Sequence, residues 1–263
     1  MMKFRKTAVL TMGLAVLMMV LTGCVSTKEA VSSNLFFPKV RFMSAPVQSS
    51  PKVAAFTSKD GIVITATNQW RQLKTKEELA ELYTDTMDDE LYASVDLALK
   101  IGDQVYFTVE KVDVSADLAD MDAISTLLKE YIADYDQEEV TAMLSDSGYS
   151  DEEIELLFKL LEEDADYDLL YQQFSNLSWF ARLEETCKDY KFIGSEEATI
   201  LGQTSSLSEY CYTNDDDVKL HFYEASLIKD GELYTLNGWC EEKSFDKNKA
   251  MLKSMIITAK WAQ

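Results

Sequence analysis

Residues 223–261, YEASLIKDGELYTLNGWCEEKSFDKNKAMLKSMIITAKW, contain the pattern that decides the fold. Residues of strand-like alternating pattern lie on both sides of Asp230-Gly231. This dipeptide is typical of a two-residue hairpin turn. Ser244 follows as a candidate N-cap, after which apolar residues recur at helical spacing. We therefore predict a hairpin followed by a C-terminal helix. The residues expected on the inner face of that helix are Met251, Leu252, Met255 and Ile256.

Strand patterns occupy both ends of the chain beyond residue 52. A hairpin is predicted around Lys59-Asp60-Gly61, followed by Trp70 and a helix from about Thr75 to Thr84 with Thr75 as its N-cap. A second strand pair is predicted over 96–114. The closing strands are predicted over 197–200, 207–213, 218–228 and 232–240, with Asn214 to Asp217 as a turn.

Between these strands, residues 117 to about 190 have helical periodicity. Asp136-x-x-Glu139 and Ser150-x-x-Glu153 are typical of capping boxes, and Gly148 stands where a short helix would stop. Residues 117–166 contain 17 acidic side chains and only two basic ones. We therefore predict a group of amphipathic helices with an acidic outer face. Their apolar positions include Ile124, Leu127, Leu128, Tyr131, Ile154, Leu157, Phe158 and Leu161.

Three phrases carry a family resemblance: DGIVITATNQW (60–70), LALKIGDQVYFTVEKVDVSADLADMDAISTLLKEY (97–131) and the closing stretch quoted above. Together they resemble the Mog1/PsbP-like family, which includes bacterial lipoproteins of the DcrB type, over roughly 53–135 and 188–263. The resemblance implies an α+β fold, an antiparallel sheet flanked by helices. The acidic stretch of about 136–187 departs from the family pattern, and we predict a helical insertion over about 117–187. Family members are binders and stabilisers more than enzymes, and no shared set of functional residues comes with the fold.

The first 24 residues predict export and lipidation. Lys3, Arg5 and Lys6 precede an uncharged apolar run from Thr7 to Leu21, too short for a comfortable membrane span of about 20 residues. Leu21-Thr22-Gly23-Cys24 then resembles the lipobox of bacterial lipoproteins, which implies cleavage after residue 23 and a lipid on Cys24. We therefore expect an extracytoplasmic protein anchored in the cell membrane through Cys24. The alternatives are an ordinary signal peptide and an N-terminal membrane anchor.

Residues 24–52 are predicted to be the lipidated cysteine and a tether. All three prolines of the chain, Pro38, Pro46 and Pro51, lie in this segment. As a flexible coil it would span about 30 Å on average and hold a single domain, residues 53–263, clear of the headgroups. The alternative is that its apolar patches, around Phe36 and Phe42, dock on the domain.

The predicted mature chain of 240 residues has 22 basic and 46 acidic side chains, a net charge of −24 once Lys3, Arg5 and Lys6 are removed. So acidic a protein argues against nucleic-acid binding, which needs basic patches. It also argues against a domain lying flat on anionic lipid. The partners expected are therefore the membrane, through Cys24, and an envelope protein.

Three cysteines besides Cys24 remain, an odd number with no C-x-x-C pair. The Asp230-Gly231 turn predicts Cys240 opposite His221, and a turn at Asp215-Asp216 predicts Cys211 opposite Leu220. The central strand then separates Cys211 from Cys240 by about 9–10 Å, beyond the roughly 7 Å limit for a disulfide. We predict that they are not bridged and that their side chains point to opposite faces.

Candidate chemistry is sparse. A Cys240–His221 nucleophile pair is one hypothesis, against a half-buried strand histidine beside a buried thiol. Weak calcium binding by Asp215-Asp216-Asp217 is another, against three solvated carboxylates. None of the common phosphate, metalloprotease or serine-hydrolase motifs occurs, so no catalytic, cofactor-binding or metal-binding residue is predicted. The aromatic residues of the closing strands, including Tyr210, Tyr212, Tyr223, Tyr234 and Trp239, fit packing better than a ligand-binding surface.

Two function classes follow. The first is a non-enzymatic lipoprotein of the cell envelope that binds a protein or stabilises a complex. The second is a surface hydrolase or small-solute-binding lipoprotein. An exposed apolar patch would favour the first class, and a deep pocket with converging polar groups would favour the second. We expect the first.

Overall fold

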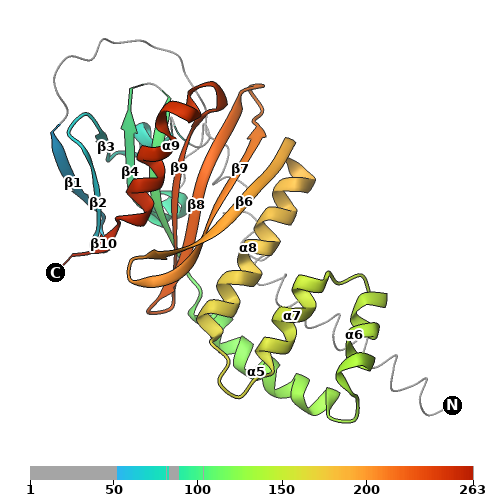
Figure 1. The fold of residues 1–263 in the computed structure, drawn as a ribbon. Helices are drawn as coiled ribbons and strands as arrows, with labels where there is room; N and C mark the ends of the chain where they lie inside the picture. Colours follow the sequence, from blue (N-terminus) through green and yellow to red (C-terminus); the bar gives the residue numbers. More distant parts are fainter. Residues whose placement is uncertain (1–51, 81, 83–88, 103, 263) are drawn as a thin grey trace. The chain divides into compact units, whose positions relative to one another are not determined.

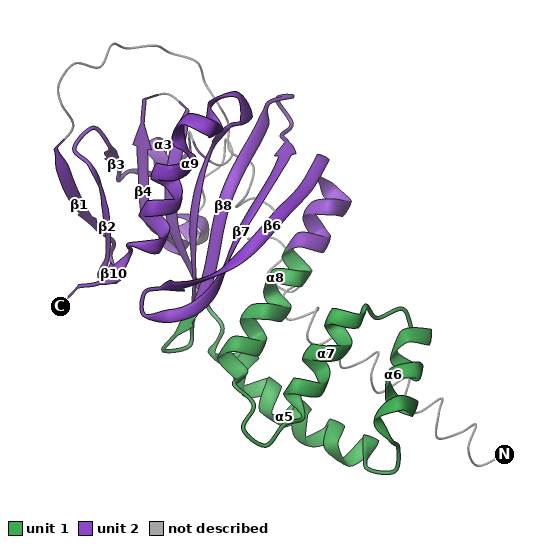
Figure 2. Ribbon diagram, in the orientation of Figure 1, with its two compact units in different colours: residues 1–29, 113–179, 228–232 green, residues 30–112, 180–227, 233–263 purple. Residues whose placement is uncertain are grey.

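The structure, a computed structural model, describes residues 52–262 except residues 81, 83–88 and 103. The chain is of the α+β class, as predicted (Figure 1). It divides into two compact units (Figure 2). Unit 1 contains Asp113–Trp179 and Ile228–Glu232, and unit 2 contains the described residues up to Val112, Phe180–Leu227, and those from Leu233 onward. A single domain over 53–263 stays a prediction, because compactness does not test whether one unit folds without the other.

Among the described residues, seven strands form the main sheet, and its neighbouring strands at positions 71–73/98–100, 95–101/105–110, 188–200/203–213 and 207–213/219–225 pair antiparallel. The two-residue turns Leu201-Gly202 and Asp230-Gly231 both have positive φ at each residue, which is the conformation that tight hairpins require. The strand order is β3 (Arg71–Leu73), β4 (Val95–Ile101), β5 (Val105–Asp113), β9 (Glu232–Glu241), β8 (Lys219–Lys229), β7 (Gln203–Thr213) and β6 (Lys188–Ile200).

A second, three-stranded sheet contains the predicted N-terminal hairpin. Strands β1 (Val53–Thr57) and β2 (Ile62–Thr67) pair antiparallel around a turn in which Gly61 has φ +88°. The last strand, β10 (Lys260–Trp261), joins the other edge of β2. The two ends of unit 2 are therefore joined in one sheet.

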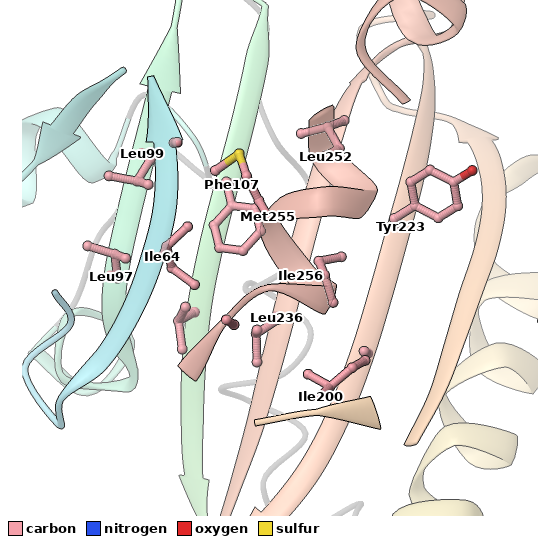
Figure 3. Packing of buried hydrophobic residues seen from close by; sticks show 14 of the residues in the cluster. Ile64, Leu97, Leu99, Phe107, Ile200, Tyr223, Leu236, Leu252, Met255 and Ile256 are labelled. Carbon is pink, nitrogen blue, oxygen red and sulfur yellow. The ribbon is translucent and has the colours of Figure 1, made fainter. Parts of the chain in front are cut away.

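Helix α9 (Glu242–Ile257) contributes Leu252, Met255 and Ile256 to a buried cluster shared with both sheets (Figure 3). Gly238 on β9 permits this close packing, because an added Cβ would meet the Leu252 side chain at 3.1 Å and Phe107 at 3.4 Å. The predicted inner face of the helix is therefore correct, although Met251 is only half-buried.

Three predicted boundaries were wrong. Helix α9 begins two residues before Ser244, and its N-cap Glu241 makes no side-chain cap bond. Strand β6 begins at Lys188, so the helical periodicity expected to about 190 ends earlier and the strand is much longer than 197–200. Within the described residues, α3 (Lys76–Leu79) is a single turn closed by Ala80, although its Thr75–Glu78 capping box is present. A further short helix, α4, spans Asp89–Ser94.

Unit 1 contains the predicted acidic helices, two of which begin at the predicted capping residues. Ser150 and Glu153 form a reciprocal capping box, whereas Asp136 accepts a hydrogen bond from the N–H of Glu139. Gly148 has φ +93°, and the bonds around it close the preceding helix in a Schellman motif. The helices are α5 (Ser115–Ile132), α6 (Gln137–Asp146), α7 (Asp151–Leu160) and α8 (Tyr167–Thr186), of which α8 continues beyond Trp179 into unit 2.

The helices of unit 1 pack through a small buried set of side chains. The hydroxyl of Ser125 on α5 donates to the carbonyl of Leu160 on α7 at 2.7 Å, which ties these two helices together. On α7 the buried face is centred on Leu157 and differs from the predicted one, since Phe158 and Leu161 are only half-buried. The fully buried apolar residues of α5 to α7 are Met121, Ile124, Leu128, Val140, Leu144, Ile154, Leu156, Leu157 and Leu160.

Candidate functional site

The predicted lipidation site, Cys24, lies outside the described residues, and so does the predicted tether up to residue 51. Lipidation of Cys24 stays a prediction. In the part of the chain that the structure describes, the helices are all too short or too polar to cross a membrane.

The register between β7 and β8 corrects the predicted position of Cys211. Cys211 lies opposite His221, and Tyr212 lies opposite Leu220. The connection is a five-residue loop rather than a two-residue turn, because the Asn214 side chain accepts from the N–H groups of Asp216 and Val218 at 3.2 and 2.9 Å. A shift by one residue turns the Cys211 side chain to the other face of the sheet.

Cys211 and Cys240 are both free thiols, as predicted. Strand β8 lies between their strands, so two strand spacings separate them. Distance alone therefore prevents the bridge. The prediction that they point to opposite faces was wrong, because Cys211 shares the face of His221, which lies under α9 with Cys240.

His221 is held between two carboxylates beneath α9. Its Nε2 lies 2.9 Å from Glu209 Oε1 on β7, and its Nδ1 lies 2.5 Å from Glu242 Oε2 at the start of α9. The ring stacks on Phe245 with centroids 3.4 Å apart, and Lys219 lies 3.5 Å from the second oxygen of Glu242. The cluster joins β7, β8 and α9.

This geometry does not assemble a Cys–His nucleophile. Both ring nitrogens face carboxylates, so neither is directed at a thiol. Burial, with the carboxylates of Glu241 and Glu242, raises the pKa of the Cys240 thiol to about 12, although Asn248 opposes the shift. Burial also raises the pKa of Cys211. Because the thiolate is the reactive form, both thiols are poor nucleophiles at neutral pH.

The acidic turn after β7 makes ordinary surface contacts. Asp217 adopts φ +58° and pairs with Lys188 at 2.6 Å, which lowers the pKa of Asp217. Among the residues that the structure describes, no three His, Cys, Asp or Glu side chains gather closely enough to hold a metal ion. The structure therefore adds no observation in favour of the calcium hypothesis.

The aromatic residues of the closing strands pack together, as predicted. Tyr210 and Tyr212 share one face, and Phe222 stacks on each of them with centroids 4.9 Å apart. Trp239 continues the row, 6.0 Å from Phe222 and 5.5 Å from Tyr106. All five side chains are buried, so they are not an exposed ligand-binding surface.

A buried polar group lies on the same face of the sheet, and the sequence analysis missed it. The Glu224 carboxylate accepts from the Tyr210 hydroxyl at 2.7 Å and from the Asn237 amide at 3.5 Å. Within the described residues, two buried polar atoms on β9 have no partner: the Asn237 carbonyl oxygen and the Trp239 indole N–H. Buried polar atoms normally have partners. Alternation along β9 places Asn237 and Trp239 on this face, a signal that the sequence does contain.

An exposed apolar ridge runs along α5 in unit 1. Ala123, Leu127 and Tyr131 are spaced four residues apart, and Leu127 and Tyr131 are 55% and 50% exposed. The sequence grouped Leu127 and Tyr131 with Ile124 and Leu128, but only the latter pair is buried. We call Ala123, Leu127 and Tyr131 the α5 ridge. Such exposure of large apolar side chains beside one another is typical of interaction surfaces.

The comparisons with known proteins identify no family: no family model matches the chain, and no curated protein matches it. Solved structures that match include the PsbP protein CyanoP from Synechocystis sp. PCC 6803, with 13% identity over 81% of this chain and 95% of that chain, and a TM-score of 0.39.

Two other matches are LpqN, involved in cell envelope biogenesis of Mycobacterium tuberculosis, and PA94, a putative regulator of unknown function from Pseudomonas aeruginosa. LpqN is 10% identical over 82% of this chain and 93% of its own, with a TM-score of 0.38. PA94 is 7% identical over 76% and 91%, with a TM-score of 0.31. At these scores the matches carry no argument about function, and membership of the Mog1/PsbP-like family stays a prediction.

Proposed function

We propose that the mature protein is a lipid-anchored extracytoplasmic lipoprotein whose folded part is a non-enzymatic, protein-binding or complex-stabilising module of the cell envelope. The observation that carries the proposal is the α5 ridge. Complete burial of a large apolar side chain contributes about 1.5–3 kcal/mol. Leu127 and Tyr131, each at least half exposed, leave much of that free energy to be gained by covering them.

The environments of the histidine and the buried cysteines support a non-enzymatic role. His221 is engaged at both nitrogens, and burial raises the thiol pKa of Cys211 and Cys240. A general base or nucleophile must instead reach a substrate atom. The contacts of His221 with Glu209 and Glu242 therefore hold α9 to strands β7 and β8.

The anchor is tested by replacing Cys24. In cells given a radiolabelled fatty acid, Cys24→Ala should abolish the label and leave the precursor uncut, because the lipidated thiol is required for cleavage in the lipoproteins that it resembles. The matched control is Cys187→Ala, which removes a free, half-buried thiol and should keep both label and cleavage. Continued labelling of the Cys24→Ala protein would overturn the anchor.

Protein binding is tested by photocrosslinking in living cells. A photoreactive amino acid at position 127 or 131 should form a discrete adduct with an envelope protein. The same amino acid at Ile257, an exposed apolar position on α9, should not form it. Adducts that appear equally at all three positions, or at none, would contradict the proposal.

A second candidate function, binding of a small solute, is favoured by two buried polar atoms on β9 that have no partner within the described residues. An acceptor on Asn237 and a donor on Trp239 are both buried without partners in the described residues. A small polar molecule that reached either atom could form the missing hydrogen bond. A solute that raises the melting temperature of the wild-type protein but not of an Asn237→Leu variant would establish this function. If crosslinking at position 127 also failed, solute binding would replace the first proposal.

A further inference from the structure

We infer that the α5 ridge is the docking site for a basic amphipathic helix of a partner protein, an inference that rests on the proposed function and specifies its partner. The ridge follows the row of residues four apart on α5. Rows of this kind interdigitate when two helices pack. From Ala123 to Tyr131 the row is about 12 Å long, which matches two turns of a second helix.

The adjoining side of α5 is already occupied, so the ridge widens the apolar face of this helix beyond the part that packs within unit 1. Met121, Ile124 and Leu128 are buried at 0, 8 and 6% exposure. Ser125 on that side is bonded to α7. A helix needs only one apolar face to hold it in its own fold. The ridge beside that face is therefore available to a partner.

Charge selects the kind of partner. Asp120 and Glu130 flank the ridge on α5, and both are exposed. They belong to a segment, 117–166, with 17 acidic and two basic side chains. A partner with lysine or arginine beside its apolar row would be attracted to this surface and oriented on it.

The same charges disfavour the other occupants. A second copy of this chain would bring a like-charged acidic surface against the ridge, which is repulsive. An anionic membrane surface attracts basic rather than acidic segments. An acidic partner helix would be repelled for the same reason. A cationic amphipathic helix is the occupant that satisfies both the apolar row and its acidic rim.

The test uses the mature lipoprotein in zwitterionic nanodiscs, with empty nanodiscs as the reference. The probe is a synthetic peptide of about five helical turns, with leucines on one face and lysines beside them. It should bind, and its Kd should rise with ionic strength because the flanking charges are screened. A peptide of the same composition in scrambled order should bind much more weakly.

Two variants separate the apolar contribution from the charge contribution. Leu127→Ser with Tyr131→Ser should raise Kd by about tenfold or more, since central apolar anchors dominate binding. Asp120→Asn with Glu130→Gln should raise Kd about two- to fivefold, as for exposed ion pairs, and should reduce its salt dependence. Ile257→Ser, a matched loss of an exposed apolar side chain in unit 2, should leave Kd unchanged.

Several results would overturn the inference. Equal binding of the scrambled peptide, or of the Leu127→Ser/Tyr131→Ser variant, would reduce the interaction to charge alone. Tighter binding of a peptide with glutamate in place of lysine would reverse the partner's charge. If the protein self-associates and the Leu127→Ser/Tyr131→Ser variant does not, the occupant of the ridge is a second copy of this chain. In each case the crosslinking at position 127 still decides independently whether the ridge contacts an envelope protein.

Discussion

Unit 2 buries side chains that are distant in the sequence, whereas the buried side chains of unit 1 come from consecutive helices. Ile64 on β2 and Leu252 on α9 belong to one cluster that also includes strands β4, β5, β7, β8 and β9 (Figure 3). In unit 1, Ser125 on α5 and Leu160 on α7 are 35 residues apart, and both lie within the continuous run of helices from α5 to α8. The free energy that holds unit 2 together is therefore mainly long-range apolar burial.

Unit 1 relies more on local interactions, and several of its acidic side chains lie at helix N-termini, where they stabilise the helices. Glu138 and Glu139 lie in the first turn of α6, and Asp151, Glu152 and Glu153 lie in the first turn of α7. Negative charge there interacts favourably with the helix dipole. The comparison indicates that unit 2 is held mainly by its apolar cluster, while unit 1 has an acidic surface and the exposed α5 ridge.

The largest effect is expected at the centre of the unit 2 cluster. Leu252→Ala should lower the free energy of unfolding by about 2–5 kcal/mol, because it removes a buried side chain and leaves a cavity. Leu252 is 0% exposed. The measurement is urea denaturation followed by tryptophan fluorescence. Ile257→Ala, on the same helix but 40% exposed, is the control. Similar losses for both variants would show that α9 does not hold the core.

A somewhat smaller effect is expected where β9 meets α9. Gly238→Ala should destabilise the protein by about 1–3 kcal/mol through overpacking, since the new Cβ would lie 3.1 Å from Leu252. Gly194→Ala on β6 meets nothing within 4 Å and should be neutral. Calorimetric melting of both variants checks this. A Gly238→Ala protein as stable as wild type would mean that α9 can move away from the sheet at little cost.

The closing hairpin and helix could be predicted from the sequence because their signals are local. Asp230 and Gly231 both adopt the positive φ that a two-residue turn needs. The turn after β7 could not be predicted as well. The Asn214 side chain extends it to five residues by accepting two backbone N–H groups. The three consecutive aspartates that follow are equally compatible with the two-residue turn that we predicted.

The candidate sites were harder to predict because they depend on which helix or strand packs against each face. Ile124, Leu127, Leu128 and Tyr131 all have helical spacing, and the sequence does not tell which pair meets a neighbouring helix. Likewise, alternation places Asn237 and Trp239 on one side of β9, but the absence of partners for their polar atoms within the described residues emerges only from the folded sheet. The periodicity of a sequence predicts which residues share one face of a helix or strand. Which of those faces is buried depends on the elements that pack against it.

A smaller, local effect is expected at the N-cap of α7 in unit 1. Ser150→Ala removes the hydroxyl that accepts the N–H of Glu153 and should destabilise α7 by about 1 kcal/mol. Ser145→Ala, at an exposed site inside α6, is the control. Amide hydrogen exchange should quicken in unit 1 and stay unchanged in unit 2. Equal quickening in both units would contradict the contrast drawn between them, because it would mean that they open together.

The smallest expected effect concerns pH and a buried carboxyl of unit 2. Asp96 on β4 is 2% exposed and accepts the N–H of Asp60 at 3.0 Å. Burial, with the nearby Asp60 carboxylate, raises the pKa of Asp96 above its ordinary value, although hydrogen bonds from Ser58 and the Asp60 N–H oppose the shift. The folded protein therefore holds this proton more tightly than the unfolded chain does.

It follows that Asp96 favours the folded state at low pH and disfavours it progressively as the pH rises through the interval between its unfolded and raised folded pKa. Asp96→Asn keeps an acceptor for the Asp60 N–H but cannot ionise. Denaturation at a series of pH values should show the variant gaining stability over wild type across that interval and a constant difference above it. Parallel profiles would mean that the Asp96 carboxylate is stabilised as well in the folded state as in water.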